Sequence, residues 1–348
     1  MRELSIRRPD DWHVHLRDGP GLASVAKFTA QRFGRAIVMP NLNPPIVSVD
    51  QAAAYRDRIL GALPAGCRFE PLMTLYLTDA TAPAEIDRAA GSAIVHGVKL
   101  YPAGATTHSE AGVTDIARTY AVLERMQRLG VPLLVHGETT RAEVDVFDRE
   151  TAFIDELLAP LVQRFPGLKV VFEHITTARA VDFVAGARAG VAATITPQHL
   201  LHNRNAIFSG GIRPHFYCLP VLKRERDREA LVRAATSGNP RYFLGTDSAP
   251  HDRSTKENAC GCAGMFTAHA AIELYAEVFD AAGRLDRLEG FASHFGADFY
   301  GLPRHEERIT LINESWKPAS TYDFGAGAVV PYRAGEVIAW RLAPAKSA

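Results

Sequence analysis

The segment Leu168-Lys169-Val170-Val171-Phe172-Glu173-His174 decides the fold class, because it is a nearly continuous apolar run that ends in polar side chains. Such a run is typical of a parallel strand that is buried on both faces. Seven further runs of this kind occur at 12–16, 35–39, 70–77, 94–101, 131–136, 191–196 and 241–247. Helix-like stretches alternate with them, for example at 22–33, 50–63, 115–129, 148–164, 178–189 and 227–237. Eight such units predict an α/β protein, a (β/α)8 TIM barrel.

A doubly wound open sheet is the alternative fold. It rarely needs eight strands, and no GxGxxG motif opens a helix after the first strand. The alternating pattern breaks from about residue 280, where 281–284, 293–300 and 306–316 predict an added helix and short strands or loops. We therefore expect one domain over residues 1–348, with a short C-terminal extension, since no Pro/Ser-rich linker divides the chain.

The composition excludes several classes of protein. The 348 residues carry 39 basic and 39 acidic side chains, so bulk charge does not favour nucleic acid or an anionic membrane. The four cysteines are too few for a disulfide scaffold, and Cys260-Gly261-Cys262 is interpreted as two reduced thiols in a loop. No apolar run reaches the roughly 18–20 residues that span a bilayer, and no signal peptide is visible. These features predict a cytoplasmic protein.

Polar side chains end several of the predicted strands. In a (β/α)8 barrel these ends meet at one rim, where active sites lie. The rim residues are His13, His15, Asn41, Lys99, His136, His174 and Asp247. The pair His13 and His15 is a weak signal alone, although side chains at i and i+2 of a strand share a face. Together with the other rim residues it predicts a metal site.

The number of candidate ligands indicates two metal ions rather than one. A single catalytic metal uses about three protein ligands, and this rim offers more. Histidine and carboxylate ligands suit Zn²⁺, and also Co²⁺ or Mn²⁺. An ammonium at Lys99 beside two dications is strongly disfavoured. Either the pKa of Lys99 is depressed, or CO₂ converts its amine into a carbamate that bridges the two metals; charge balance favours the carbamate.

At this point the motifs are similar to those of a known family. The chain resembles the class II dihydroorotases of bacterial pyrimidine synthesis, within the amidohydrolase superfamily, over nearly its whole length. The matching segments are 7–19, 36–42, 98–103, 134–138, 172–177, 193–199, 245–251 and 260–264. The HxH motif is common to the superfamily, whereas Pro250-His251 and Gly261-Cys262-Ala263-Gly264 are more specific to dihydroorotases.

This resemblance implies a role for each matched residue. His13, His15 and Asp247 would hold one zinc ion, His136 and His174 the other, and carboxylated Lys99 would bridge them. Substrate binding is implied for His15, Arg17, Asn41, His136, Leu219, His251 and Ala263, with Leu219 and Ala263 acting through their backbones. Thr106 and Thr107 would belong to a flexible loop, in which Gly104 and His108 vary. A homodimer is also implied.

The implied reaction is the reversible cyclisation of N-carbamoyl-L-aspartate to dihydroorotate in the synthesis of UMP. A metal-bridging hydroxide would attack the ring amide, and Asp247 would act as the general acid and base. Arg17 suits bidentate binding of the substrate carboxylate. Another cyclic amidohydrolase, such as a hydantoinase or allantoinase, is less compatible with this carboxylate-binding set. An inactive barrel that serves as a scaffold is disfavoured, because the metal set is intact.

Overall fold

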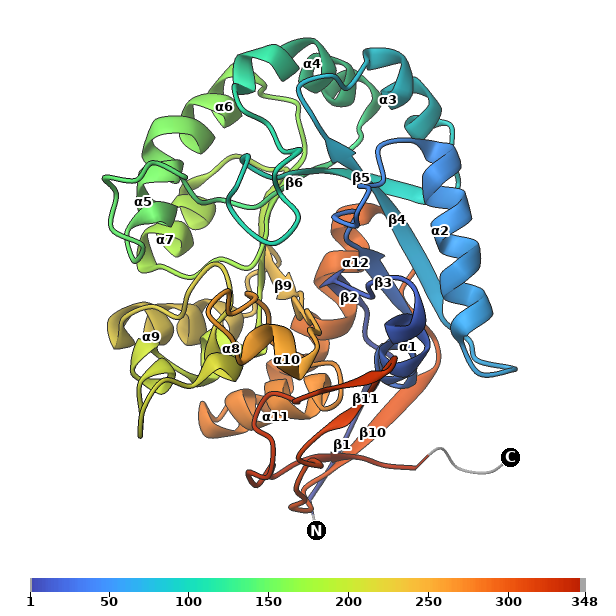
Figure 1. Cartoon of the computed structure of the whole chain (residues 1–348), viewed down its shortest axis with the longest axis vertical. Coiled ribbons are helices and arrows are strands. Elements are labelled where there is room, and N and C mark those ends of the chain that lie inside the picture. Colours follow the sequence, from blue (N-terminus) through green and yellow to red (C-terminus); the bar gives the residue numbers. More distant parts are fainter. Residues whose placement is uncertain (1, 345–348) are drawn as a thin grey trace.

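The computed structural model describes residues 2–344, so Met1 and residues 345–348 of the predicted domain lie outside the described residues. Eight parallel strands form one sheet in the order β2 to β9 (Figure 1). They are β2 Asp11–Val14, β3 Arg35–Val38, β4 Glu70–Leu77, β5 Val95–Leu100, β6 Leu133–Val135, β7 Val170–Phe172, β8 Val191–Ile195 and β9 Tyr242–Leu244. The strand order follows the sequence without a reversal, which contradicts the doubly wound alternative.

The first and last strands of the sheet, β2 and β9, are joined by hydrogen bonds near their C-terminal ends, and we call this junction the β2–β9 seam. The Asp247 amide donates to the His13 carbonyl at 2.9 Å, and the His15 amide donates to the Ser248 carbonyl at 3.0 Å. The buried carboxylate of Asp11 accepts hydrogen bonds from the Thr246 amide at 2.9 Å and the Thr246 hydroxyl at 2.6 Å. The predicted (β/α)8 barrel is confirmed.

Helices surround the strands (Figure 1). They are α1 Pro20–Arg32, α2 Val49–Ala62, α3 Pro83–Ala90, α4 Tyr120–Leu129, α5 Arg149–Phe153, α6 Ala159–Arg164, α7 Ala178–Gly186, α8 Pro197–Leu201, α9 Glu225–Ala235, α10 Arg253–Lys256, α11 Ala271–Ala281 and α12 Phe295–Tyr300. The predicted helix 148–164 contains a π-helical segment, Ile154–Leu158, between α5 and α6. None of the helices in residues 2–344 is long and apolar enough to cross a bilayer.

One buried apolar cluster combines residues of the barrel strands with Ala297 of α12. Trp12 packs edge-on to Phe243 and stacks on Tyr300 with ring centroids 4.7 Å apart. Gly296 allows this contact, because a Cβ there would lie 2.0 Å from Trp12 Nε1. The C-terminal helix expected within 293–300 therefore packs against the amino-terminal end of the barrel, opposite the rim that carries the polar residues.

A smaller antiparallel sheet joins the two ends of the chain. Strand β1, Glu3–Arg7, pairs with β10, Arg308–Ile312, which pairs with β13, Arg341–Leu342. The strands β11, Tyr322–Phe324, and β12, Gly327–Val329, form a hairpin. The predicted strands do not include 3–7, although Leu4 and Ile6 alternate with polar residues as in a half-exposed strand, and its partner lies about 300 residues away. All four cysteines are free, as predicted for Cys260 and Cys262.

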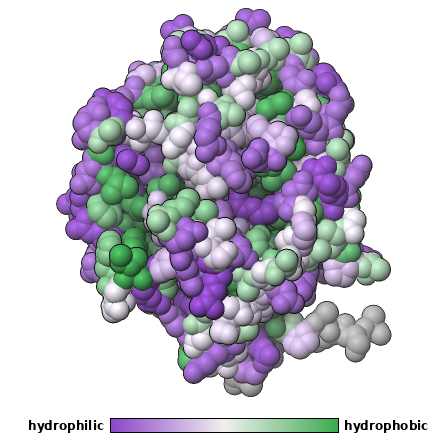
Figure 2. Space-filling model, viewed as in Figure 1, coloured by the Kyte–Doolittle hydropathy of each residue, from purple (hydrophilic) through white to green (hydrophobic). Residues whose placement is uncertain are grey.

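The molecular surface in the same view is mixed in character. Figure 2 shows that apolar residues on this face form small groups between hydrophilic ones. Among the large apolar side chains of the described residues, Ile212 and Phe208 are the most exposed, at 82% and 59%.

Candidate metal and substrate site

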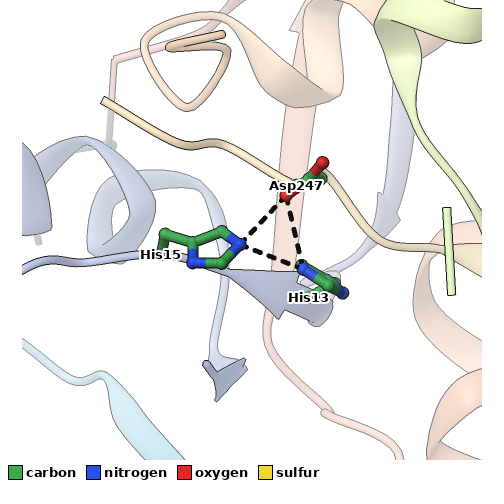
Figure 3. Close-up of side chains that lie close together, drawn as sticks. All are labelled: His13, His15 and Asp247. Atoms are coloured by element: carbon green, nitrogen blue, oxygen red, sulfur yellow. Dashed lines mark hydrogen bonds and ion pairs between the residues drawn. The ribbon is translucent and has the colours of Figure 1, made fainter. Parts of the chain in front are cut away.

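Three of the predicted ligands converge where β2 meets β9 (Figure 3). Asp247 Oδ1 lies 3.1 Å from His15 Nε2 and 3.3 Å from His13 Nε2, and the two imidazole nitrogens are 3.3 Å apart. These atoms occupy the corners of a small triangle, which is a geometry that one metal ion can share. His13 is 1% exposed and Asp247 is 6% exposed, so the triangle is buried.

The other predicted ligands lie beside this triangle: Lys99 is on β5, and His136 and His174 follow the ends of β6 and β7. The rings of His136 and His174 are 4.8 Å apart between centroids, and His174 is 4.9 Å from His13 by the same measure. His136 Nε2 contacts Glu138 at 2.9 Å. Lys99 lies within β5 and is completely buried. The structure therefore brings all six predicted metal-site residues to one rim.

Glu173 belongs to this site although it is not among the predicted site residues. Its carboxylate forms an ion pair with Lys99 and places Oε1 3.0 Å from His13 Nδ1. It is completely buried, and it forms a second group of potential ligands with His13 and His174. The signal was present in the sequence, because Glu173 ends the same strand as His174. A carboxylate behind an imidazole orients a metal-binding histidine and fixes its tautomer.

Backbone conformation places three of these side chains. Arg17, His174 and Asp247 have φ values of 61°, 42° and 46°, in the left-handed region that non-glycine residues rarely adopt. Strained backbone of this kind persists where the surrounding structure holds it, and it is common at functional sites. The hydrogen bonds across the β2–β9 seam hold Asp247 in this way.

Burial and neighbouring charges set the protonation of His13, His15 and Asp247. Burial alone would lower the pKa of His13, but the carboxylates of Glu173 and Asp247 outweigh it and raise this pKa to about 9. Burial lowers the pKa of His15 to about 4. Burial would raise the pKa of Asp247, yet hydrogen bonds from both histidines hold it well below its usual value. Among the protein groups alone, Asp247 is therefore an anion at neutral pH.

Burial acts on Lys99 and His174 in the second half of the site. Burial lowers the pKa of Lys99, and the carboxylate of Glu173 opposes this effect. Burial and the nearby His136 and Lys99 hold the pKa of His174 well below its usual value. His174 Nδ1 is a buried nitrogen without a hydrogen-bond partner among the described residues. A neutral imidazole with an unpartnered nitrogen in a buried cluster fits a metal ligand.

The predicted carboxylate-binding residues lie next to the metal ligands. Arg17 Nε donates to the Pro250 carbonyl at 2.9 Å, and its Nη2 lies 2.8 Å from His251 Nε2. His251 Nε2 lies 2.9 Å from the Ala263 carbonyl oxygen. Asn41 Nδ2 donates to the Thr107 carbonyl at 3.0 Å.

The predicted flexible segment covers the site. Thr106 and Thr107 line the same pocket as the histidines, and the Thr107 hydroxyl donates to the Ala263 carbonyl at 3.4 Å. Leu219 and Ala263 line the pocket as well. The pocket holds about 20 Å³, whereas sites for small organic ligands hold roughly 300 Å³ or more. The pocket is therefore smaller than a site for a small organic ligand, and Thr106 and Thr107 form part of its lining.

The comparisons with known proteins agree with this geometry. The model of the amidohydrolase family matches residues 10–313. The dihydroorotase of Alkalilimnicola ehrlichii is 64% identical over 342 residues, which cover 98% of this chain and 100% of that protein. The dihydroorotase of Nitrosomonas europaea is 65% identical, with 98% of each chain covered. The chain belongs to the dihydroorotase family of amidohydrolases.

Solved structures place this family member in the same group. The dihydroorotase of Campylobacter jejuni superposes with a TM-score of 0.89 at 36% identity, and covers 98% of this chain and 97% of its own. The dihydroorotase of Saccharomyces cerevisiae, solved with 5-fluoroorotic acid, gives 0.90 at 32% identity and covers 99% and 100%. An L-hydantoinase from Arthrobacter aurescens, at 15% identity and a TM-score of 0.80, shares the fold alone. The predicted resemblance to class II dihydroorotases is confirmed.

Proposed function

We propose that this protein is a zinc-dependent dihydroorotase that interconverts dihydroorotate and N-carbamoyl-L-aspartate in the synthesis of UMP. One observation carries the proposal. Five of the candidate metal ligands, with Arg17 and Asn41 of the candidate carboxylate-binding set, line one pocket at the C-terminal ends of the barrel strands. The chemistry of this pocket suits a cyclic amide that bears a carboxylate.

The chain's residues would hold two zinc ions. His13, His15 and Asp247 would bind one, and His136 and His174 the other, with Lys99 between them as a bridging carbamate. The donor set fits, because it consists of buried imidazoles and a carboxylate with no thiolate among them. When bound, such metals lower the pKa of water and polarise a carbonyl group.

Burial prepares Lys99 for carboxylation. It lowers the pKa of this lysine and so favours the neutral amine, the form whose lone pair attacks CO₂. The lone pair forms a new N–C bond while one C–O π bond of CO₂ opens onto oxygen, and one N–H proton would pass to water, which leaves an anionic carbamate with one N–H on Nζ. Glu173 already contacts Nζ, so it can accept a hydrogen bond from the N–H that remains. The Glu173 carboxylate would thus accept a hydrogen bond from Nζ of Lys99 both before and after the modification.

Asp247 would move the proton during ring opening. The oxygen of water attacks the ring carbonyl carbon, its proton passes to a carboxylate oxygen of Asp247, and that proton then reaches the ring nitrogen as the C–N bond breaks. The reverse sequence closes carbamoyl aspartate. His13 and His15 keep Asp247 ionised and fix its direction.

Arg17 would bind the substrate carboxylate through its guanidinium group, together with Asn41 and His251. We expect Arg17→Ala to raise the KM for dihydroorotate roughly 10- to 100-fold, because it removes charge-assisted hydrogen bonds. Metal content should stay unchanged. The KM of Arg17→Lys should lie between those of the unsubstituted enzyme and Arg17→Ala, because an ammonium keeps the charge but not the bidentate geometry. Steady-state kinetics with metal analysis test this, and loss of metal in Arg17→Ala would contradict the assigned role.

The proposed function is tested by measuring metal per chain together with both reaction directions. We expect about two zinc ions per chain and activity with dihydroorotate and carbamoyl aspartate. Hydantoin and allantoin, which lack the carboxylate, should react poorly. Metal without either dihydroorotase activity would overturn the substrate assignment. We also propose a homodimer, following the family resemblance; sedimentation of the holoenzyme at one chain's mass would contradict it.

A further inference from the structure

Lys256 is a buried cation that the proposed reaction does not use. It ends the short helix α10 and is 4% exposed. Its Nζ donates to three backbone carbonyls: Gly264 at 2.7 Å, Cys262 at 2.7 Å and Tyr217 at 3.1 Å. An ammonium has three N–H donors, and each of these has an acceptor here.

The three carbonyls belong to the two segments that form one wall of the pocket. The carbonyls of Cys262 and Gly264 flank that of Ala263, which contacts His251 and Thr107 on the pocket side. Successive carbonyls of this segment therefore point alternately to Lys256 and to the pocket. The third carbonyl, that of Tyr217, lies two residues before Leu219 and also accepts the Gly264 amide at 3.1 Å.

We propose that Lys256 is a positioning residue for substrate binding, which ties the backbones of Leu219 and Ala263 together so that they meet the substrate ring in a fixed geometry. The inference rests on the proposed function, because these two backbones are implied to contact that ring. No side-chain carboxylate pairs with Lys256 among the described ion pairs, so the carbonyls themselves stabilise the charge.

Two further features support this role. Gly264 has a φ of 150°, and a Cβ there would lie 2.6 Å from the Ala249 carbonyl oxygen. The backbone at Gly264 therefore packs closely against the backbone at Ala249, which follows β9 in the chain. Burial lowers the pKa of Lys256 to about 8, which still leaves the ammonium form dominant at neutral pH. The ammonium faces these three backbone carbonyls, and Lys256 is not among the residues that line the pocket.

The test compares Lys256→Met and Lys256→Gln with Arg253→Met and Arg253→Gln, which remove a cation from the exposed side of the same helix. We expect Lys256→Met to raise the KM for dihydroorotate at least about tenfold and to change kcat by less than about threefold, since a loss of binding that is equal in the ground state and the transition state raises KM alone. Lys256→Gln, which keeps two donors, should show a smaller rise. The metal content of the Lys256 variants should match that of the unsubstituted holoenzyme. The Arg253 variants should have the same KM as the unsubstituted holoenzyme.

Amide hydrogen exchange provides a readout that does not depend on turnover. In the zinc-loaded Lys256 variants, exchange should become faster in residues 214–220 and 259–265 and remain unchanged in the barrel strands. Unchanged KM and exchange in both variants would overturn the proposal. If Lys256→Met does not fold, the KM and exchange of Lys256→Gln decide the test. Failure of Lys256→Gln to fold, when Arg253→Gln folds, would also overturn the proposal. If the unsubstituted enzyme does not act on dihydroorotate, the proposed function fails while the exchange result still tests the tie.

Discussion

Asp247→Asn lowers kcat for dihydroorotate hydrolysis and for carbamoyl aspartate cyclisation by at least about a thousandfold; this is the largest effect on turnover that we expect from an isosteric substitution. The variant removes the negative charge and the proton-accepting oxygen from the triangle with His13 and His15. Asparagine tolerates the left-handed backbone better than most residues, so the φ of 46° at this position should be retained. The effect is therefore chemical rather than conformational.

Steady-state kinetics in both directions, with metal analysis of the same samples, test this expectation. The exposed carboxylate of Asp148 pairs only with a surface arginine, so Asp148→Asn is the matched control and should keep its kcat. Folding of both variants is checked by thermal unfolding. A kcat within tenfold of the unsubstituted enzyme for Asp247→Asn would contradict a proton-transfer role for Asp247.

The barrel could be predicted because its strands are buried on both faces. In β7, the apolar residues Val170–Phe172 occupy consecutive positions, and the polar residues Glu173 and His174 follow where the chain reaches the rim. Knowing the fold then places residues that are far apart in sequence, such as His13 and Asp247, at one end of neighbouring strands. The order of these strands follows from the chain order, so no contact information was needed.

Other features depend on contacts that a sequence does not display. Strand β1 is a short alternating segment, and its pairing with β10, about 300 residues later, depends on tertiary packing. Glu173 looks like the end of a strand until Lys99 and His13 are seen on either side of its carboxylate. Lys256 resembles any surface lysine in sequence, since its acceptors are backbone carbonyls, which every residue carries. Roles that depend on backbone atoms leave no mark on residue identity.

Lys99→Met should remove most of the bound metal and lower kcat at least about a thousandfold, because it deletes the proposed bridging ligand at full side-chain burial. Methionine nearly preserves the volume of lysine, so a cavity is not the cause of the loss. Metal per chain and kcat are measured on the purified variant. Mass spectrometry of the unsubstituted chain after growth with isotopically labelled bicarbonate should place the label on Lys99. Full metal content in Lys99→Met would contradict a bridging role.

The ion pair between Lys99 and Glu173 predicts a separate effect on stability once metal has been removed by a chelator. Lys99→Met then leaves the buried Glu173 carboxylate without its closest cation, and the free energy of unfolding in urea should fall by roughly 3–5 kcal/mol. The double variant Lys99→Met/Glu173→Gln should recover most of this stability, since neither charge remains. It should not recover metal or activity, because the bridging ligand is still absent. Recovery of activity in the double variant would show that the single variant failed through misfolding and that Lys99 does not bridge the metals.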